Sequence, residues 1–354
     1  MADISLDAID FRNVDEGAMY QHIEGFFTNF LIWWKLSNSF PLPSHFVKAN
    51  KIVISGMGGS AQAGTIAKDL LFGEAKVTVE LVRDYHLPAY VDRNTLVIAI
   101  SYSGTTEETL NTFIEAYSKG AMLLGIGTGG QMAALARKYK VPYFEHDYEA
   151  QPRAALHVHL ASMLNFMSRL GHVTISNEML GRVNELETYM RAHWVETIPE
   201  GNNEAKQLAR KMLNHVPVVI GDGVLCGVAG RYKSHFNENA KSMAYYELLP
   251  EMNHNALVGS ERPVKSPEWL HLLLLDSKYT DEQNKTRMVL TEQLFKDRKF
   301  KVTRQQFSSS SPLEEVLLAV SFGDYVSYYL ALLNQVDPTA VNVIAQFKSK
   351  LSHE

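Results

Sequence analysis

Short runs of aliphatic and β-branched residues alternate with helical hydrophobic patterns through the first part of the chain. The runs predict strands near residues 51–55, 77–82, 95–101 and 121–126, with a last edge strand near 142–145. The helical patterns between them cover residues 61–72, 107–119 and 131–139. Strands that alternate with helices favour a doubly wound, mostly parallel sheet. In such sheets ligands bind outside the carboxyl ends of the strands.

The second half repeats this pattern in a weaker form. Residues 216–233 have the pattern of a strand, a glycine-rich turn and a helix, and later strands are expected at 269–276 and 299–307. Further helices are expected at residues 17–37, 151–171, 177–213 and 312–334, with a final one capped by Asp337-Pro338. The chain therefore has the pattern of an α/β protein with two tandem domains, which we place at residues 1–172 and 173–354.

Two strand-to-helix turns in the first domain have the composition of phosphate-binding loops. They are KIVISGMGGSAQAG at 51–64 and TLVIAISYSGTTEETL at 95–110. A glycine-rich turn leaves the first N–H groups of the next helix free, and the helix dipole favours an anion there. Hydroxyl donors could come from Ser60, Ser101, Ser103, Thr105 and Thr106. The second loop contains no Lys or Arg, which suits a sugar phosphate better than a nucleoside triphosphate.

Other interpretations of these loops are weaker. The first loop has Ala61 where a dinucleotide-binding G-x-G-x-x-G motif has its third glycine, and no G-x-x-x-x-G-K-[ST] motif occurs in the chain. In the second loop Thr105 and Glu108 have the spacing of a helix capping box, which is compatible with phosphate binding. The presence of two such loops favours the phosphate interpretation.

Composition excludes several classes of protein. A net charge of −5 gives no footprint for nucleic acid, and a single cysteine, Cys226, excludes an internal disulfide. The acidic N-terminus lacks the features of a signal peptide, and the apolar stretches are too short to span a bilayer, so we expect a cytoplasmic protein without membrane partners. His146, His157 and His159 lack the spacing of a zinc site, so no metal is expected.

Residues 231–255, RYKSHFNENAKSMAYYELLPEMNHN, add two more specific motifs, NENAK and LPExNHN. With GMGGS and SYSGTTEET, they make the chain resemble the sugar-isomerase (SIS) domain family. The closer resemblance is to the bifunctional phosphoglucose/phosphomannose isomerases, and it runs in order from about residue 50 to the C-terminus. The chain departs from the usual pattern at Thr105, at His235-Phe236 and at Ala256, where Asn, Gln-Leu and an acidic residue are common. These departures bear on substrate preference.

The resemblance implies two tandem SIS-type domains, flavodoxin-like and doubly wound. It also implies interconversion of glucose 6-phosphate and mannose 6-phosphate with fructose 6-phosphate through a cis-enediol(ate), without a metal or other cofactor. By resemblance, Glu238 of NENAK would be the base, and His254 of NHN would act in ring opening with help from Lys348. Arg153 of QPRAA would stabilise the enediolate oxygens. The phosphate and sugar would be held by Gly58, Gly59, Ser60, Ser101, Ser103 and Thr106.

Periodicity alone assigns these residues less specific roles. A helix over 229–244 has an apolar stripe of Ala229, Tyr232, Phe236, Ala240 and Met243. Glu238 lies opposite with Arg231 and Ser234, as on a solvated face. His254 is one of 13 histidines, and Lys348 in a last helical turn complements the dipole. Arg153 in a first turn is unfavourable to the dipole, which favours a functional role.

The resemblance further implies a homodimer in which His254 serves the site of the partner subunit. The aromatic segment 26–34 and Tyr245-Tyr246 fit an interface, or equally a core. The expected ligand is a small sugar phosphate. Two alternatives remain open: a SIS isomerase for another phosphosugar or an amino-sugar phosphate, and a non-catalytic phosphosugar-binding regulator. The joint presence of Glu238, His254, Arg153 and Lys348 argues against the regulator.

Overall fold

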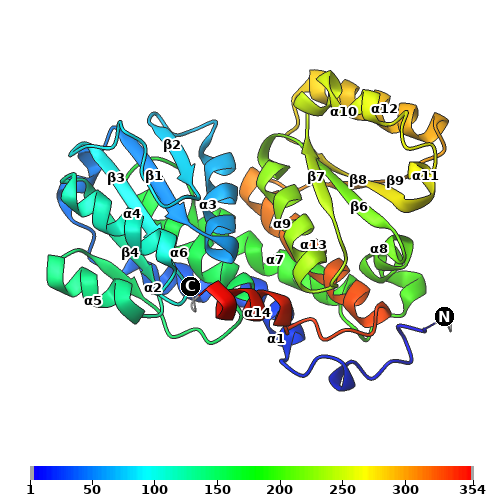
Figure 1. The fold of residues 1–354 in the computed structure, drawn as a ribbon, viewed down its shortest axis with the longest axis horizontal. Helices are drawn as coiled ribbons and strands as arrows, with labels where there is room; N and C mark the ends of the chain where they lie inside the picture. Colours follow the sequence, from blue (N-terminus) through cyan, green and yellow to red (C-terminus); the bar gives the residue numbers. More distant parts are fainter. Residues whose placement is uncertain (1–3, 352–354) are drawn as a thin grey trace. The chain divides into compact units, whose positions relative to one another are not determined.

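The computed structural model describes residues 4–351 and contains two parallel sheets, each flanked by helices (Figure 1). The chain forms two compact units. The first-sheet unit comprises Gly25–Glu187 and Ser310–Val316, and the second-sheet unit comprises the segment ending at Glu24, Thr188–Ser309 and the segment from Leu317. Compactness thus divides the chain differently from the expected 172/173 boundary. The N-terminal segment is held in the second-sheet unit by Lys206, whose Nζ donates to Asp7 Oδ1 at 2.9 Å.

The first sheet has the strand order β2-β1-β3-β4-β5, with every neighbouring pair parallel. Its strands are β1 (Lys51–Gly56), β2 (Thr78–Val82), β3 (Thr95–Ile100), β4 (Met122–Gly127) and β5 (Tyr143–Glu145). The helices and 3-10 turns of this unit are α2 (Phe26–Asn38), η2 (Ser44–Lys48), α3 (Gly58–Leu71), α4 (Glu107–Ser118), α5 (Gly130–Tyr139), η3 (Pro152–Ala155) and α6 (Leu156–Arg169). All six residues of β3 are buried, as expected for a central strand covered on both faces.

The second sheet has the order β7-β6-β8-β9 and is also parallel throughout. Its strands are β6 (Val216–Gly221), β7 (Tyr245–Leu248), β8 (Leu270–Ser277) and β9 (Lys301–Phe307). The helices and turns are η1 (Phe11–Asn13), α1 (Met19–Glu24), η4 (Glu200–Asn202), α8 (Glu204–Met212), η5 (Gly223–Leu225), α9 (Cys226–Glu238), η6 (Glu251–His254), α10 (Ala256–Gly259), α11 (Ser266–Trp269), α12 (Glu282–Asp297) and α14 (Asn342–Leu351). The division between the units falls within α7 (Asn177–His193) and α13 (Pro312–Leu333). The two sheets share the sequential order 2-1-3-4, so the weak repeat expected from the sequence is present.

Several predicted helices are broken in the structure. The helix expected at 17–37 is two helices, α1 and α2, because Gly25 interrupts the pattern between them. The helix expected at 177–213 ends at His193, and Pro199 precedes the short turn η4 before α8 begins. Helix α12 and strand β7 are present in the structure but are not predicted by the sequence patterns. The first has a weak apolar stripe, and the second is only four residues long.

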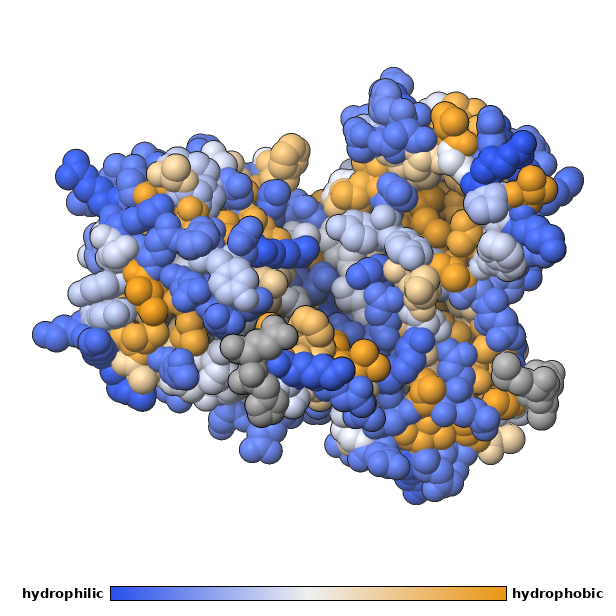
Figure 2. Space-filling model, viewed as in Figure 1, coloured by the Kyte–Doolittle hydropathy of each residue, from blue (hydrophilic) through white to orange (hydrophobic). Residues whose placement is uncertain are grey.

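Helix α13 is long and apolar enough to cross a membrane by length and composition. Its most apolar stretch is entirely buried within the described part of the chain, as in a core helix. Ser311 caps its first turn, because Ser311 Oγ accepts the Glu314 N–H at 3.4 Å and donates to Glu314 Oε1 at 2.7 Å. On the face drawn in Figure 2, hydrophilic residues predominate and apolar residues are exposed in smaller groups.

Candidate active site

The two glycine- and serine-rich loops lie side by side at the carboxyl edge of the first sheet. Strands β1 and β3 are parallel neighbours, and their last residues, Gly56 and Ile100, are register partners. After β1 the chain passes through α3 to β2 on one side, whereas after β3 it passes through α4 to β4 on the other. The loops therefore occupy the point where the strand order reverses, which is where open α/β sheets bind ligands.

The first loop leads directly into α3. Met57 is the N-cap residue without a side-chain hydrogen bond, and the helix begins at Gly58, whose φ is +50°. Such a φ is adopted far more easily by glycine than by other residues. The Ser60 N–H donates to the carbonyl of the N-cap residue Met57 at 3.1 Å, so the N–H groups of Gly58 and Gly59 are the ones at this helix start that have no acceptor within the helix. The geometry fits the predicted role of this turn in holding a phosphate.

Hydroxyl groups of the second loop hydrogen-bond to one another. Ser101 Oγ donates to Thr106 Oγ1 at 3.0 Å, and the hydroxyls of Ser103 and Thr105 are 2.8 Å apart. Thr106 is the N-cap residue of α4 and makes no side-chain capping bond, so the capping box proposed for Thr105 and Glu108 is wrong. The hydroxyls that could have capped the helix are instead grouped beside its N-terminus.

Arg153 lies against the first loop. A Cβ atom on Gly59 would be only 2.8 Å from both the Cα and the backbone nitrogen of Arg153. Only glycine allows the backbones of α3 and η3 to approach this closely. Arg153 itself is 3% exposed at the start of η3. The structure thus brings together Arg153 and the phosphate loops, which lie far apart in the sequence.

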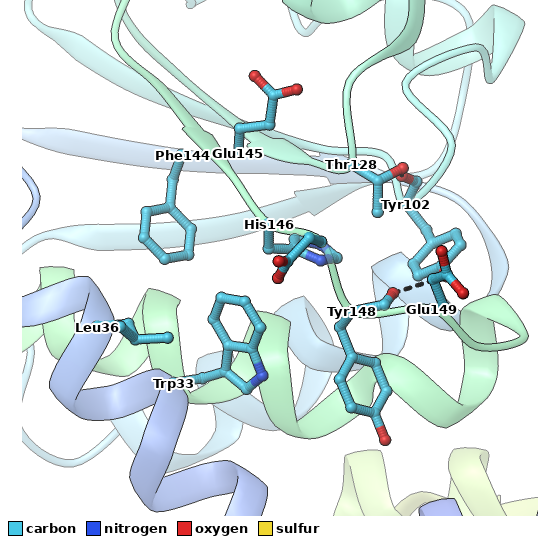
Figure 3. A pocket seen from close by; sticks show the side chains of 10 residues that line it. Trp33, Leu36, Tyr102, Thr128, Phe144, Glu145, His146, Tyr148 and Glu149 are labelled. Carbon is cyan, nitrogen blue, oxygen red and sulfur yellow. Dashed lines mark hydrogen bonds between the residues drawn. The ribbon is translucent and has the colours of Figure 1, made fainter.

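A cavity of about 720 Å³ opens near the ends of β4 and β5 (Figure 3). Its lining residues are Trp33, Leu36, Tyr102, Thr128, Phe144, Glu145, His146, Asp147, Tyr148 and Glu149. The three carboxylates disfavour an anion in this cavity, so it does not suit the phosphate. Burial lowers the pKa of His146 to about 4, and that of His159 well below its usual value. The two rings share a hydrogen bond between their Nε2 atoms of 3.1 Å. Within residues 4–351, no group of three His, Cys, Asp or Glu side chains could hold a metal ion.

Glu238 is the last residue of α9, in the second-sheet unit, and it is half-buried. It lines a second cavity, of about 620 Å³, together with Asn237, Lys241, Val336, Asp337 and residues 340–344. Lys241 Nζ donates to the carbonyls of Glu238 and Asp337, at 2.7 and 2.5 Å. The lysine of NENAK therefore ties the end of α9 to the segment that precedes α14. This role of Lys241 is not predicted from the sequence.

The helical periodicity predicts that Arg231 lies with Glu238 on a solvated helix face, and for Arg231 this prediction is wrong. Its guanidinium is buried and pairs with Asp324 of α13, at 3.0 Å from Nε to Oδ1 and 2.7 Å from Nη2 to Oδ2. His235 Nδ1 lies 3.1 Å from Asp324 Oδ1. Burial would raise the pKa of Asp324, but Arg231 and His235 outweigh it and lower the pKa to about 2. A single acidic residue in the middle of an apolar helix was the signal for such a buried partner.

His254 is exposed at the end of η6 in the second-sheet unit. The asparagines on either side hold this turn, because Asn253 Nδ2 donates to Thr291 Oγ1 at 2.9 Å and Asn255 Nδ2 donates to Glu251 Oε1 at 2.8 Å. The NHN motif therefore presents its histidine at the surface while its amide side chains fix the backbone. This arrangement is compatible with a histidine that acts on a ligand outside its own turn.

Lys348 lies in α14, where residues 342–351 are all exposed. The first residues of this helix line the Glu238 cavity. The predicted site residues thus fall into two sets. Arg153 and the six loop residues belong to the first-sheet unit, whereas Glu238, His254 and Lys348 belong to the second-sheet unit.

Comparison with known proteins defines the class of both units. The SIS domain family model matches residues 45–150, and the model for the bacterial phospho-glucose isomerase C-terminal SIS domain matches residues 201–351. The C-terminal domain of glucosamine-fructose-6-phosphate aminotransferase from Francisella tularensis aligns with a TM-score of 0.70 and 16% identity, over 91% of this chain and 98% of that one. The chain is an α/β protein with two SIS-type domains in tandem, which confirms the predicted fold.

Sequence relatives narrow this class. The bifunctional phosphoglucose/phosphomannose isomerase of Caldicellulosiruptor bescii is 36% identical over 304 residues, covering 86% of this chain and 90% of the relative. The enzyme of the same name from Aquifex aeolicus is 31% identical over 335 residues, covering 94% and 98%. The chain belongs to the bifunctional phosphoglucose/phosphomannose isomerase family.

Proposed function

We propose that this chain interconverts glucose 6-phosphate and mannose 6-phosphate with fructose 6-phosphate through a cis-enediol(ate). The observation that carries this proposal is the close approach of Gly59 to the backbone of Arg153. A Cβ atom added to Gly59 would lie 2.8 Å from the Arg153 Cα. In this contact the backbone of Arg153 lies beside the first of two neighbouring loops whose amides and hydroxyls suit a phosphate. An aldose–ketose isomerase for a sugar phosphate can use both features, because the phosphate anchors the substrate and a fixed cation stabilises the oxygen that becomes negative.

In the proposed reaction the phosphate binds at the first turns of α3 and α4. Gly58, Gly59 and Ser60 contribute from the first loop, and the hydroxyls of Ser101, Ser103 and Thr106 contribute from the second. Since the second loop carries no Lys or Arg, these donors identify the phosphate by hydrogen bonds and by the helix dipoles. Arg153 then faces the oxygens on C1 and C2 of the open-chain sugar.

Glu238 is the proposed base. Its carboxylate takes the proton from C2 of the open aldose, and the electron pair forms the C1–C2 double bond of the enediolate as negative charge moves to the C1 oxygen. The carboxyl group returns the proton to C1 while the proton of the C2 hydroxyl passes to the C1 oxygen, which leaves a ketone at C2 and a hydroxyl at C1. One carboxylate suffices for both transfers, and no metal or other cofactor is required.

His254 and Lys348 are proposed to open the sugar ring before this step. A histidine can donate a proton to the ring oxygen and accept one from the anomeric hydroxyl near neutral pH. Lys348 extends from a helix whose first turn lines the Glu238 cavity. Its positive charge would assist the same step.

The direct test is an assay of the purified chain with fructose, glucose, mannose and glucosamine 6-phosphates, before and after exhaustive chelation. We expect the first three to interconvert, and we expect activity to survive EDTA. Binding of fructose 6-phosphate without turnover would instead support a regulator. Preferential turnover of the amino sugar would support a different SIS isomerase, and activity restored only by added zinc would contradict the metal-free mechanism.

We also propose that the working unit is a homodimer with composite sites, in which His254 serves Glu238 of the other subunit. The exposure of His254 supports this arrangement. So do the side chains of Met243, Tyr245 and Tyr246, which are 64%, 54% and 43% exposed on or next to the edge strand β7. The aromatic segment of α2 gives no such support, because Phe26, Phe27, Phe30 and Trp33 are buried.

Complementation tests the shared site. Inactive Glu238→Gln and inactive His254→Ala subunits are mixed and allowed to exchange, which gives a heterodimer with one intact site and up to about half of the wild-type activity, by two-fold symmetry. Glu238→Gln protein taken alone through the same exchange is the control and should stay inactive. Full activity of a monomer by light scattering, or no recovery after proven exchange, would refute the shared site.

A further inference from the structure

Tyr102 stands between Ser101 and Ser103 in the second phosphate loop, and the mechanism above gives it no task. Its side chain reaches away from the loop toward the segment that precedes Arg153. The Ala150 N–H donates to Tyr102 Oη at 2.7 Å. Tyr102 Oη donates to the carbonyl of Tyr148 at 2.8 Å (Figure 3). Burial raises the pKa of Tyr102, so the phenol keeps its proton and remains a donor at neutral pH.

The backbone of Tyr102 is held as firmly as its side chain. Its N–H donates to Ser60 Oγ at 3.1 Å, which joins the second loop to the first. Its carbonyl accepts from both the N–H and the Oγ1 of Thr128, at 2.9 and 2.6 Å. One residue therefore connects the first loop, the second loop, the turn after β4 and the segment at 148–150.

These contacts connect the first phosphate loop to Arg153. Tyr102 donates its N–H to Ser60 and accepts the Ala150 N–H at its hydroxyl, and Arg153 lies three residues after Ala150. The Ala154 N–H donates to the Gln151 carbonyl at 2.8 Å, which keeps this short span folded. The backbone of Arg153 in turn lies against Gly59, the neighbour of Ser60, so the series of contacts returns to the first loop.

We infer that Tyr102 is a positioning residue that fixes Arg153 relative to the phosphate loops. The inference rests on the proposed function, since it assigns Arg153 the stabilisation of the enediolate. Ser60 and Thr128 hold the Tyr102 backbone within the phosphate loops, and the hydroxyl of the same residue holds the segment that leads to Arg153. The loop that anchors the substrate thereby also aligns the cation with the reacting carbons.

The test is Tyr102→Phe, which keeps the ring and removes both hydrogen bonds of the hydroxyl. We expect kcat to fall about 10- to 100-fold, because a displacement of the order of 1 Å in a positioned group has effects of this size. KM for fructose 6-phosphate should change less than about threefold, since the loop hydroxyls and amides remain. Tyr329→Phe is the matched control. It removes a buried hydroxyl that donates to the Trp194 carbonyl at 2.6 Å in the second-sheet unit, and should leave kcat unchanged.

A double-mutant cycle separates positioning from general weakening of the fold. If Tyr102 acts through Arg153, Tyr102→Phe should cause no further loss of kcat in an Arg153→Met background. Multiplicative losses, or a wild-type kcat in Tyr102→Phe alone, would overturn the inference.

Hydrogen exchange provides a readout that does not depend on catalysis. Peptides covering residues 148–155 should exchange faster in Tyr102→Phe than in the wild type, whereas Tyr329→Phe should leave them unchanged. Unchanged exchange in Tyr102→Phe would overturn the inference even if the chain proves inactive on every phosphosugar. If the wild type turns over no phosphosugar, the proposed function is refuted. Faster exchange in Tyr102→Phe would then still support the coupling between Tyr102 and residues 148–155.

Discussion

The hydroxyl groups of Ser101 and Thr106 together form one hydrogen-bond donor arrangement that suits a phosphate. Ser101 is 1% exposed, and it uses its proton on Thr106 Oγ1 at 3.0 Å. This leaves the Thr106 proton available to another acceptor at the N-terminus of α4, because Thr106 makes no side-chain capping bond. A phosphate oxygen is the acceptor that the surrounding amides and dipole favour. The pair therefore acts as one donor arrangement, although each residue alone resembles an ordinary cap.

Replacing both residues, Ser101→Ala with Thr106→Ala, should weaken binding of fructose 6-phosphate. Each lost hydrogen bond to a charged group costs about 1.5–3 kcal/mol, so calorimetry should show at least a tenfold rise in Kd. Binding of unphosphorylated fructose should be weak in the wild type and indifferent to the change. Equal affinity for fructose and its phosphate would show that these loops do not recognise the phosphate.

Local motifs located the candidate residues better than periodicity did. The glycine and hydroxyl residues of both loops could be predicted because strand-to-helix turns have a local signature. The burial of Arg231 was not predicted, because it depends on Asp324, which lies 93 residues further along the chain and on another helix. Tyr102 and Lys241 were missed for a similar reason, since their roles come from backbone groups that are distant in the sequence.

At the scale of elements, the close approach of α3 and η3 determines where Arg153 lies. Most strands were predicted to within two residues, because β-branched runs bounded by glycine give a clear signal. Helix ends were harder to predict. The helical structure breaks at Gly25 and at the turn η4, although the helical hydrophobic pattern of the sequence continues through both positions.

Gly59→Ala should therefore impair catalysis more than binding. The added Cβ would lie 2.8 Å from the Arg153 backbone, which must shift. We expect at least a tenfold loss of kcat, with a smaller change in KM, in steady-state assays. Gly73→Ala is the control, because a Cβ there meets nothing within 4 Å. If Gly59→Ala and Gly73→Ala have the same kcat, the position of Arg153 does not limit the reaction.

At the scale of the whole molecule, buried histidines make stability depend on pH. Burial is the main cause that lowers the pKa of His146 and of His271 to about 4, and it also lowers the pKa of His159. The unfolded chain binds protons at these sites near pH 6.5, whereas the folded chain binds them only at lower pH. The unfolded state is therefore favoured progressively as the pH falls from about 6.5 to 4.

We expect the thermal midpoint to be higher at pH 7.5 than at pH 5, as measured by circular dichroism. Each histidine contributes at most about 1.4 kcal/mol per pH unit to the slope of the unfolding free energy. His271→Gln should reduce this slope, although the loss of the contact of His271 with Thr303 lowers the midpoint at every pH. A midpoint that rises on acidification from pH 7.5 to 5 would contradict the assignment of these histidines as buried and neutral.

The family of the whole chain was predictable because four separate motifs occur in the right order. The sequence relatives confirm that family. The roles of Glu238, His254, Arg153 and Lys348 remain predictions, because each depends on contacts with a substrate. Proton transfer by Glu238 is the central claim, since without it the loops and Arg153 would only bind a phosphosugar.

The most direct test of that claim is isomerisation of fructose 6-phosphate in D₂O, with the glucose 6-phosphate product analysed by NMR. For the wild type we expect solvent deuterium at C2. For Glu238→Gln we expect product formation at least about 100-fold slower, because general-base catalysis contributes factors of about 10²–10⁴. Glu204→Gln, an exposed carboxylate at the start of α8, is the matched control and should behave as the wild type. Product without deuterium, formed by Glu238→Gln at the wild-type rate, would contradict the account.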